Sequence, residues 1–377
     1  MITFFSNFIN EHQIPFCEAM YKQCNGEFRF VATEAFSQER INLGFEDKSE
    51  LFPFVVQSYK DEESFQKAME LGRNSDVVII GSAPDVFIEE RLKEGKLTFR
   101  YCERFFKKGK WRILDPRVLL AYYKNHVRYR KKNLHMLCAS AYTAPDCRFI
   151  SSYPKKTYKW GYFPPVKKHQ DRKALIEEKK EGTLLWAGRF IDWKHPEYPI
   201  EVARKLKEEG YQFQLTMIGV GPLQGKVEKL VEKYELQNHV HLLGAMSPEK
   251  VRENMRASEI YLFTSDKNEG WGAVLNESMN DCCAVVANKA IGSAPYLIKD
   301  GENGLMYKNS VNDLYAKVKL LLDNPALRKK LGENAYQTLA TTWNGEEGAR
   351  RLLGLIEDIN AGRESRFESG PCSKDYK

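Results

Sequence analysis

The stretch Ile260–Ala287, IYLFTSDKNEGWGAVLNESMNDCCAVVA, decides the fold. Its first residues, Ile260–Thr264, form a short apolar run that is typical of a buried strand. A loop with two glycines follows, and Ala273–Asn280 then has the spacing of a helix. The apolar run Ala284–Ala287 predicts a second strand. A strand, a helix and a strand in this order indicate a parallel sheet covered by helices.

The same alternation of short apolar runs and helical patterns continues through most of the chain. Further strands are predicted at Ile2–Ser6, Phe28–Ala32, Phe54–Val56, Val77–Ile80, Leu134–Ala139, Cys147–Ile150, Thr183–Ala187, Phe213–Ile218 and His239–Leu243. Helices are predicted at Glu62–Arg73, Pro199–Glu209, Gln224–Tyr234, Pro248–Ala257, Asn312–Leu322, Pro325–Thr341 and Glu346–Asn360. We therefore expect two doubly wound α/β domains, residues 1–165 and 166–345, followed by a helix and a frayed polar tail over 346–377.

The composition limits the class of protein. Of 377 residues, 42% are apolar and 29% are charged, which excludes a disordered chain. No stretch approaches the roughly 20 apolar residues that cross a bilayer, and the first residues lack the basic start and cleavage site of a secretory signal. We therefore expect a cytoplasmic protein. The eight cysteines include no C-x-x-C pair and the histidines no H-x-x-x-H pair, so we expect reduced cysteines and no metal site.

The loop and helix of residues 265–280 carry the most specific chemical signal. Glu269 precedes Gly270 and Gly272, and Glu277 follows eight residues later, about two turns inside the helix. Glycines at the start of a helix leave its free N–H groups uncrowded, which suits a phosphate. The two carboxylates suit hydroxyl groups on either side of that phosphate. The layout predicts a ligand with a central diphosphate and hydroxyl-bearing rings. The alternative is that Glu269 only stabilises the start of the helix and Glu277 is only solvated.

Two turns after other strands of the second domain carry further signals. Arg189 follows the strand Thr183–Ala187, and Lys194 lies five residues further on. Two cations there suit a pyrophosphate. The alternative is that Arg189 pairs with Asp192 or Glu197 on the surface. Gly219 lies in IGVGPLQG, which nearly matches the dinucleotide fingerprint G-x-G-x-x-G but lacks its third glycine. Such a near-match is weak evidence, because a tight turn explains the glycines equally well. The missing third glycine disfavours a nicotinamide-dependent dehydrogenase.

The motifs GRF…K, IGVGP and EGWG…E, followed by the loop Gly301–Gly304, resemble those of the retaining nucleotide-sugar glycosyltransferases of family 4 (glycosyl transferases group 1). The first domain more closely resembles the bacterial capsule and exopolysaccharide type. The motifs cover most of residues 183–345. The resemblance implies the GT-B fold, in which two Rossmann-like domains face a central cleft, the first for the acceptor and the second for the donor. It also implies that the C-terminal helix crosses back to the first domain.

The resemblance assigns roles to the motif residues. Arg189 and Lys194 are expected to hold the diphosphate, and Glu277 the ribose hydroxyls. Glu269 is expected to contact the donor sugar as the catalytic-site glutamate. The donor-binding set also includes Gly219, Gly270, Trp271 and Gly272, of which the last three approach the donor through their backbones. The expected co-substrate is a UDP- or GDP-sugar, with no other cofactor and, since no Asp-x-Asp string occurs, no metal.

The first domain offers softer signals. His12, in the loop after the first strand, and His126 are further catalytic candidates, although a structural histidine is the plain alternative for each. Residues 105–132 hold ten basic residues against one acid, with aromatic residues and leucines between them, which suits an anionic membrane surface. Nucleic acid is the rival partner, but no recognised module is present, and a solvated helical face is the plain alternative. Residues expected on the acceptor or membrane side are Arg100, Arg104, Lys107, Lys108, Lys110 and Arg112.

The sequence thus predicts a hexosyltransferase that passes a hexose from a nucleotide diphosphate sugar to a glycan or lipid-linked acceptor. Retention of configuration and a role in cell-surface polysaccharide synthesis are expected from the resemblance. The protein is expected in the cytoplasm, in peripheral contact with the inner face of an anionic membrane and without nucleic acid as a partner. A nucleotide-sugar epimerase of the same fold is the alternative function, and a dehydrogenase and a non-catalytic binding protein also remain open.

Overall fold

The computed structural model describes residues 1–36, 46–308 and 310–376. The chain divides into two compact units. Unit 1 comprises Met1–Pro165 together with Trp343–Lys377, and unit 2 comprises Val166–Thr342. Unit 2 therefore ends at Thr342, three residues before the expected end of the second domain at residue 345, in the loop before the last helix.

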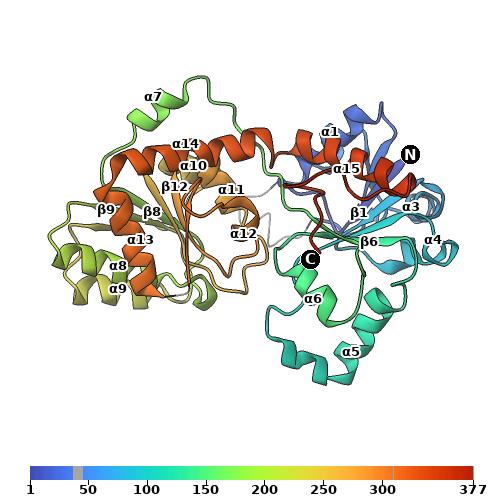
Figure 1. Ribbon diagram of the computed structural model, residues 1–377, viewed down its shortest axis with the longest axis horizontal. Helices are drawn as coiled ribbons and strands as arrows, with labels where there is room; N and C mark the ends of the chain where they lie inside the picture. Colours follow the sequence, from blue (N-terminus) through green and yellow to red (C-terminus); the bar gives the residue numbers. More distant parts are fainter. Residues whose placement is uncertain (37–45, 309, 377) are drawn as a thin grey trace. The chain divides into compact units, whose positions relative to one another are not determined.

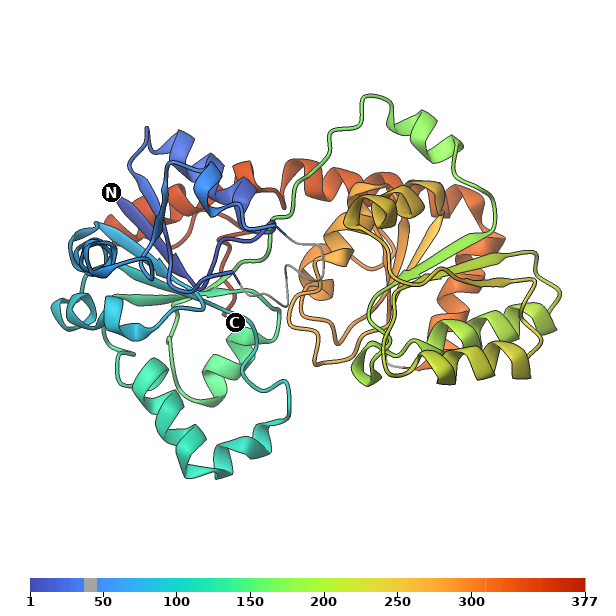
Figure 2. The ribbon, with the colours of Figure 1, turned by 180° about the vertical axis from the view of Figure 1, so that it is seen from behind.

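Unit 1 is built on a parallel sheet with the strand order β3-β2-β1-β4-β5-β6-β7 (Figures 1 and 2). The strands are β1 (Ile2–Ser6), β2 (Phe28–Ala32), β3 (Val55–Gln57), β4 (Val77–Ile80), β5 (Thr98–Cys102), β6 (Leu134–Cys138) and β7 (Thr157–Lys159). The helices are α1 (Ile14–Gln23), α3 (Glu62–Asn74), α4 (Glu89–Glu94), α5 (Pro116–Tyr122), α6 (Thr143–Phe149) and α15 (Gly345–Asn360). Single turns are η1 (Ser49–Leu51), η2 (Asp85–Phe87), η3 (Lys110–Leu114) and η4 (Tyr123–Val127).

The C-terminal segment completes unit 1. Helix α15 packs against α1, and Gly345 allows this because a Cβ there would lie only 2.5 Å from the carbonyl carbon of Pro15. Beyond α15, the chain runs beside β7, where Cys372 donates its N–H to Lys159 and Lys159 donates its N–H to Ser373. Because Cys372 and Ser373 are buried, the expectation of a frayed tail is wrong. The tail covers the edge strand and satisfies its backbone groups.

Unit 2 is built on a second parallel sheet with the order β10-β9-β8-β11-β12-β13. The strands are β8 (Thr183–Ala187), β9 (Gln214–Ile218), β10 (Val240–Leu242), β11 (Ile260–Phe263), β12 (Ala284–Asn288) and β13 (Leu305–Tyr307). The helices are α7 (Arg172–Glu177), α8 (Glu197–Glu208), α9 (Gln224–Lys233), α10 (Pro248–Ala257), α11 (Val274–Asn280), α12 (Ala294–Leu297), α13 (Val311–Asp323) and α14 (Pro325–Thr341), with the turn η5 (Asp192–Lys194).

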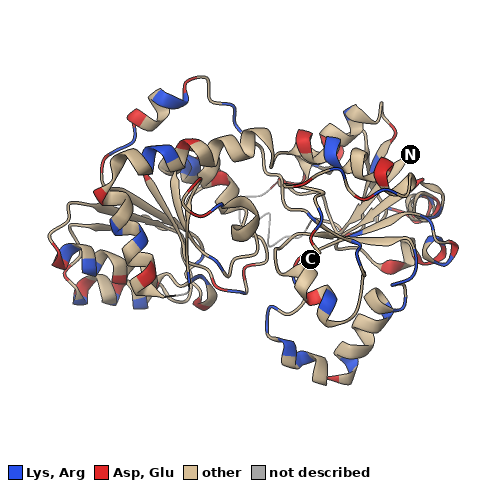
Figure 3. Ribbon diagram, viewed as in Figure 1, with Lys and Arg blue, Asp and Glu red and all other residues tan. Residues whose placement is uncertain are grey.

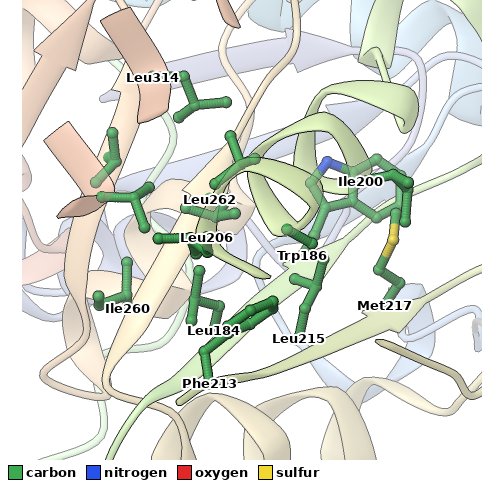
Figure 4. Close-up of a cluster of buried hydrophobic side chains, with 14 of the residues drawn as sticks. Leu184, Trp186, Ile200, Leu206, Phe213, Leu215, Met217, Ile260, Leu262 and Leu314 are labelled. Atoms are coloured by element: carbon green, nitrogen blue, oxygen red, sulfur yellow. The ribbon is translucent and has the colours of Figure 1, made fainter. Parts of the chain in front are cut away.

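The core of unit 2 lies between its sheet and the helices on one face (Figure 4). Trp186 of β8 and Met217 of β9 point from the sheet, and Ile200 and Leu206 of α8 fill the space against them. Each aliphatic side chain that leaves water in this way contributes about 1.5–3 kcal/mol to folding. The resulting rigid sheet fixes where the loops at its carboxyl edge begin.

Most of the predicted elements are present with ends shifted by one or two residues. The strand predicted at Cys147–Ile150 is wrong, because these residues belong to helix α6 and its end, where Pro145 occupies the first turn. The strands β5, β7 and β13 were not expected. The expectation of an α/β fold with two doubly wound domains is confirmed. All eight cysteines are free, as expected.

Candidate functional site

The candidate site lies at the carboxyl edge of the unit 2 sheet. The chain builds β8, β9 and β10 in one direction across the sheet and then returns to add β11 beside β8. In open α/β sheets, ligands bind at such a reversal, outside the carboxyl ends of the strands. Here Arg189 follows the end of β8, and Ser265 and Glu269 follow the end of β11. The topology therefore brings two of the predicted motifs to one edge.

Lys194 and Glu269 form an ion pair at this edge. The distance from Lys194 Nζ to Glu269 Oε2 is 2.7 Å, and the two side chains are only 14% and 12% exposed. The hydroxyl of Ser265 donates to the same carboxylate oxygen at 2.9 Å. The pair joins residues 75 positions apart in the sequence and ties the loop after β8 to the loop after β11. A partly buried ammonium and a hydrogen-bonded carboxylate are thus held side by side.

The backbone that carries Lys194 is itself fixed. Thr264 donates its hydroxyl to the carbonyl of Lys194 at 2.6 Å and accepts a hydrogen bond from Trp186 Nε1 at 2.8 Å. The ammonium of Lys194 lies 4.7 Å from the ring centre of Trp193, within the range of a cation–π contact. The cation is therefore pre-positioned and does not hang free in solvent.

Arg189 is the unpaired cation of the site. Its side chain is exposed, and it makes no ion pair or hydrogen bond with any residue that the structure describes. The alternative that Arg189 pairs with a nearby acid is therefore wrong for Asp192, and Glu197 instead accepts from His195 Nδ1 at 3.1 Å. A guanidinium without a carboxylate partner remains available for an incoming anion.

Gly219 has a structural reason for being glycine. It adopts φ of +132°, and a Cβ at this position would lie 1.9 Å from the carbonyl oxygen of Gly188. The loops after β8 and β9 are joined by backbone hydrogen bonds, in which Gly188 donates to Ile218 and Phe190 donates to Val220. The glycine is required to let these loops meet beside Arg189, whether or not it touches a ligand.

The glycine loop before α11 has a buried and an open part. Trp271 is fully buried, and its Nε1 donates to Asn276 Oδ1 at 2.9 Å, so its side chain belongs to the core and a donor contact is left to its backbone. Gly272 adopts φ of +84° against the ring of Phe263, where a Cβ would clash at 2.5 Å. Within the described part of the chain, the N–H groups of Gly270 and Gly272 donate no hydrogen bond.

Glu277 lies half-buried on α11. Its charge acts on Tyr261 of β11, whose hydroxyl donates to the carbonyl of Ala187 at 3.1 Å. Burial raises the pKa of Tyr261 well above its usual value, so this residue remains a neutral donor. The two glutamates of the motif thus belong to the same strand–loop–helix unit, with Glu269 on the loop and Glu277 on the helix.

Several residues of this network were not predicted. Ser265 directly follows the strand predicted at Ile260–Thr264, and this position is a signal that could have identified it from the sequence. Thr264 and Trp186 are buried structural partners with no such signal. His195 adopts φ of +48°, a conformation that glycine favours, and its ring stacks on Tyr198 at 4.5 Å.

In unit 1, His12 is half-buried and stacks on Tyr162, with ring centres 5.7 Å apart. The hydroxyl of Tyr162 donates to Glu103 Oε1 at 2.6 Å, and Lys107 forms an ion pair with the other oxygen of Glu103. Glu103 directly follows β5, so this polar group lies at the carboxyl edge of the unit 1 sheet. His12 is therefore placed beside polar side chains at an edge where parallel sheets bind ligands.

His126 and Arg100 are interior residues and not surface contacts. His126 is buried, and its Nδ1 lies 2.8 Å from the hydroxyl of Tyr153. Burial, reinforced by the charge of Arg100, lowers the pKa of His126 to about 3, so the ring is neutral. Arg100 is also buried and forms two hydrogen bonds to Asp85, of 2.9 and 3.0 Å. These contacts argue against the expected catalytic role of His126 and the expected acceptor-side or membrane role of Arg100.

The other basic candidates differ in exposure. Arg104 is largely buried beside Asp146, and its guanidinium lies 4.9 Å from the ring of Tyr142. Lys108 and Arg112 are exposed, and exposed Lys110 has its ammonium 4.6 Å from the ring of Phe149. The expected acceptor or membrane side is therefore divided between an interior and a surface group.

Two features are absent from the described part of the chain. No group of three or more histidine, cysteine, aspartate or glutamate side chains among them is arranged to hold a metal ion. None of the helices that they form is long and apolar enough to cross a membrane.

Residues 167–338 match the family model described as Glycosyl transferases group 1. Over 168 residues, the chain is 35% identical to an uncharacterized glycosyltransferase of Methanocaldococcus jannaschii, an alignment that covers 44% of this chain and 46% of the relative. It is 30% identical over 193 residues to the alpha-D-kanosaminyltransferase of Streptomyces kanamyceticus, covering 50% of each protein. The chain thus spans about half the length of the curated relatives it matches.

Among solved structures, the chain is similar to Anabaena HepE in complex with UDP, with a TM-score of 0.69. The alignment covers 94% of this chain and 99% of HepE, at 13% sequence identity. This likeness shows the fold, which is GT-B, with two Rossmann-like α/β domains. The domain match and the names of the relatives support the expected class of enzyme, a transferase.

Proposed function

We propose that the protein is a retaining hexosyltransferase that moves a hexose from a nucleotide diphosphate sugar to a glycan or lipid-linked acceptor. The observation that carries the proposal is the Lys194–Glu269 ion pair beside the unpaired Arg189, at the point where the strand order of unit 2 reverses. A diphosphate needs two cations, and a sugar hydroxyl needs a carboxylate within reach. In this proposal Arg189 and Lys194 supply the two cations and Glu269 supplies the carboxylate. The fold already holds Lys194 and Glu269 in place through their ion pair and through the hydrogen bonds of Thr264 and Ser265.

In this proposal the diphosphate binds Arg189 as a fork and Lys194 as a point charge. Lys194 then exchanges the carboxylate of Glu269 for a phosphate oxygen, and Glu269 is released to accept a hydrogen bond from a hydroxyl of the donor sugar. Glu277 accepts from the ribose hydroxyls. Lys194 stays paired throughout, because the diphosphate replaces its carboxylate partner, and Glu269 exchanges the ammonium for hydrogen bonds from Ser265 and from the sugar hydroxyl.

Transfer then breaks the bond between the anomeric carbon and the β-phosphate oxygen and forms one to the acceptor oxygen on the same face of the sugar. The proton of the acceptor hydroxyl passes to the departing phosphate oxygen. Arg189, Lys194 and the backbone N–H groups of Gly270 and Gly272 stabilise the negative charge that develops on the diphosphate. These groups supply the neutralisation that a metal ion provides in other enzymes, so activity is expected to persist in EDTA.

The acceptor is proposed to bind unit 1, where His12, Tyr162 and Glu103 lie together. A place in cell-surface polysaccharide synthesis and a cytoplasmic location belong to the same proposal. The name of the kanosaminyltransferase relative supports sugar transfer but fixes neither the donor nor the acceptor of this chain. Contact with a membrane is a separate proposal, because it concerns another surface.

The test is a panel of UDP- and GDP-sugars, screened first for thermal stabilisation of the protein and then for transfer to glycan acceptors. Transfer to an added acceptor, with retained anomeric configuration by NMR, is the expected result. Conversion of the donor without an acceptor would instead support the alternative of an epimerase. Stabilisation by none of the nucleotide sugars would contradict the proposal.

A further inference from the structure

One segment of unit 1 exposes several large apolar side chains to solvent. Trp111 is 69% exposed and Leu114 is 81% exposed, and Leu119, Leu120 and Tyr123 are each about half exposed. These five residues, here named the apolar face, lie on η3, α5 and the first residue of η4. Helix α5 and its neighbours extend away from the sheet of unit 1 in both ribbon views (Figures 1 and 2). Several large apolar side chains exposed within one short segment are typical of an interaction site.

The opposite side of the same segment is firmly packed. Phe106 is buried, with its ring centre 5.3 Å from that of Tyr122, and the ring of Phe105 lies 4.5 Å from His126. Asp146 Oδ2 accepts the backbone N–H groups of Phe105 and Phe106 at 2.9 and 3.2 Å. The buried aromatic contacts of Phe105 and Phe106 thus attach the segment to unit 1, and the exposed side chains of the apolar face are not needed for this attachment.

Basic residues are frequent along the same segment, where the ribbon around α5 is blue at several places (Figure 3). The exposed basic residues of the segment are Lys108, Lys110, Arg112, Arg117, Lys124, Arg128, Arg130, Lys131 and Lys132. Its single acid, Asp115, is paired with Arg117 at 3.0 Å and also caps α5 by accepting the N–H of Arg117. No negative charge within the segment therefore remains unpaired to oppose an anionic partner.

We propose that this segment, residues 105–132, docks unit 1 on an anionic lipid bilayer. Trp111 and the leucines of the apolar face enter the interfacial region, and the surrounding lysines and arginines contact lipid phosphates. Charge complementarity selects anionic lipid as the occupant. Nucleic acid is also negatively charged, but its phosphate backbone does not bury exposed leucines, so it fits this surface less well than anionic lipid does. The surface shares no residue with the proposed donor site, so the two proposals can fail independently.

The experiment is co-sedimentation of the full 377-residue chain with vesicles of phosphatidylcholine alone or mixed with phosphatidylglycerol. The apolar variant carries Trp111→Ser, Leu114→Ser and Leu120→Ser. Its matched control replaces three exposed leucines elsewhere, Leu51→Ser, Leu243→Ser and Leu320→Ser. The charge variant carries Lys124→Gln and Lys131→Gln, and its control carries Lys329→Gln and Lys330→Gln. Thermal unfolding of each variant checks that the fold is kept.

The wild-type chain is expected to bind the anionic vesicles and to bind much more weakly to neutral ones. The apolar and charge variants are each expected to lower the partition coefficient by about tenfold, and added salt is expected to lower it further. Both controls should bind as the wild type does. Absence of binding to anionic vesicles, equal losses in the controls, or tighter binding to a DNA or RNA duplex than to vesicles would each overturn the proposal. The charge variant keeps the test decisive if the apolar variant does not fold.

Discussion

Glu269→Gln separates the structural and chemical roles of the Lys194–Glu269 pair, because it removes a charge with almost no change in volume. The pair is short, at 2.7 Å, and both side chains are more than four-fifths buried. Removing one partner of a fully buried pair costs about 3–5 kcal/mol. Lys194 keeps some solvent contact and glutamine still accepts from Ser265, so we expect a loss of about 1–2 kcal/mol, which lowers Tm by about 2–8 °C for a domain of this size.

The same variant makes a distinctive prediction about ligands. Lys194 no longer has to leave a carboxylate before it binds phosphate, so the Kd for a nucleoside diphosphate should be unchanged or up to about tenfold lower. Transfer should fall at least about 100-fold, because the contact with the donor sugar is lost. Scanning fluorimetry, calorimetry and a transfer assay measure the three quantities.

The matched control for this variant is Glu209→Gln, which breaks the exposed Glu209–Lys319 pair and should leave the melting temperature nearly unchanged. A Glu269→Gln variant that melts with the wild type and binds nucleoside diphosphate more weakly would refute the pair-exchange mechanism.

Three further predictions address other parts of the molecule. Glu277→Gln should weaken nucleoside diphosphate binding about tenfold and leave inorganic pyrophosphate binding unchanged, by calorimetry, because only the former has ribose hydroxyls. The pKa of buried His126 is about 3 in the folded state and near 6.5 when unfolded, so protonation favours the unfolded chain as the pH falls below about 6.5. Between pH 7 and 5, the free energy of unfolding of His126→Gln should therefore fall by about 2 kcal/mol less than that of the wild type. His241→Gln, at an exposed histidine, should behave as the wild type does. A stop after Ser369 removes the tail that covers β7 and should lower the unfolding temperature of unit 1 in calorimetric scans; an unchanged temperature would show that the tail contributes nothing.

The fold was predictable where burial gives a simple pattern. The strands of unit 2 are short apolar runs between helical segments, and the spacing of the apolar residues predicts most of them correctly. β5 was missed because Arg100 interrupts it, and only the structure shows that Asp85 neutralises this buried arginine. The helix α6 was taken for a strand in part, since Cys147, Phe149 and Ile150 are apolar and its proline-containing first turn lies further upstream.

The candidate site was predictable in its residue types but not in its pairings. Sequence identified Arg189, Lys194 and Glu269 as charged groups after strands, but it gave no sign that the last two form an ion pair across 75 residues. Contacts of that range depend on the order of strands in the sheet, which motifs alone do not reveal. The histidine candidates illustrate the same limit, because nothing in the sequence indicates that His126 is buried with its Nδ1 2.8 Å from the hydroxyl of Tyr153.

The central claim is that the carboxyl edge of unit 2 binds a nucleoside diphosphate through its own cations. Calorimetric titration of UDP and GDP into the 377-residue chain in EDTA tests it most directly. We predict saturable binding of one of them at a single site, weakened at least about tenfold by Arg189→Ala and unchanged by Lys229→Ala, an exposed lysine on α9. No saturable binding of either nucleotide, or equal affinity of the wild type and Arg189→Ala, would contradict the claim.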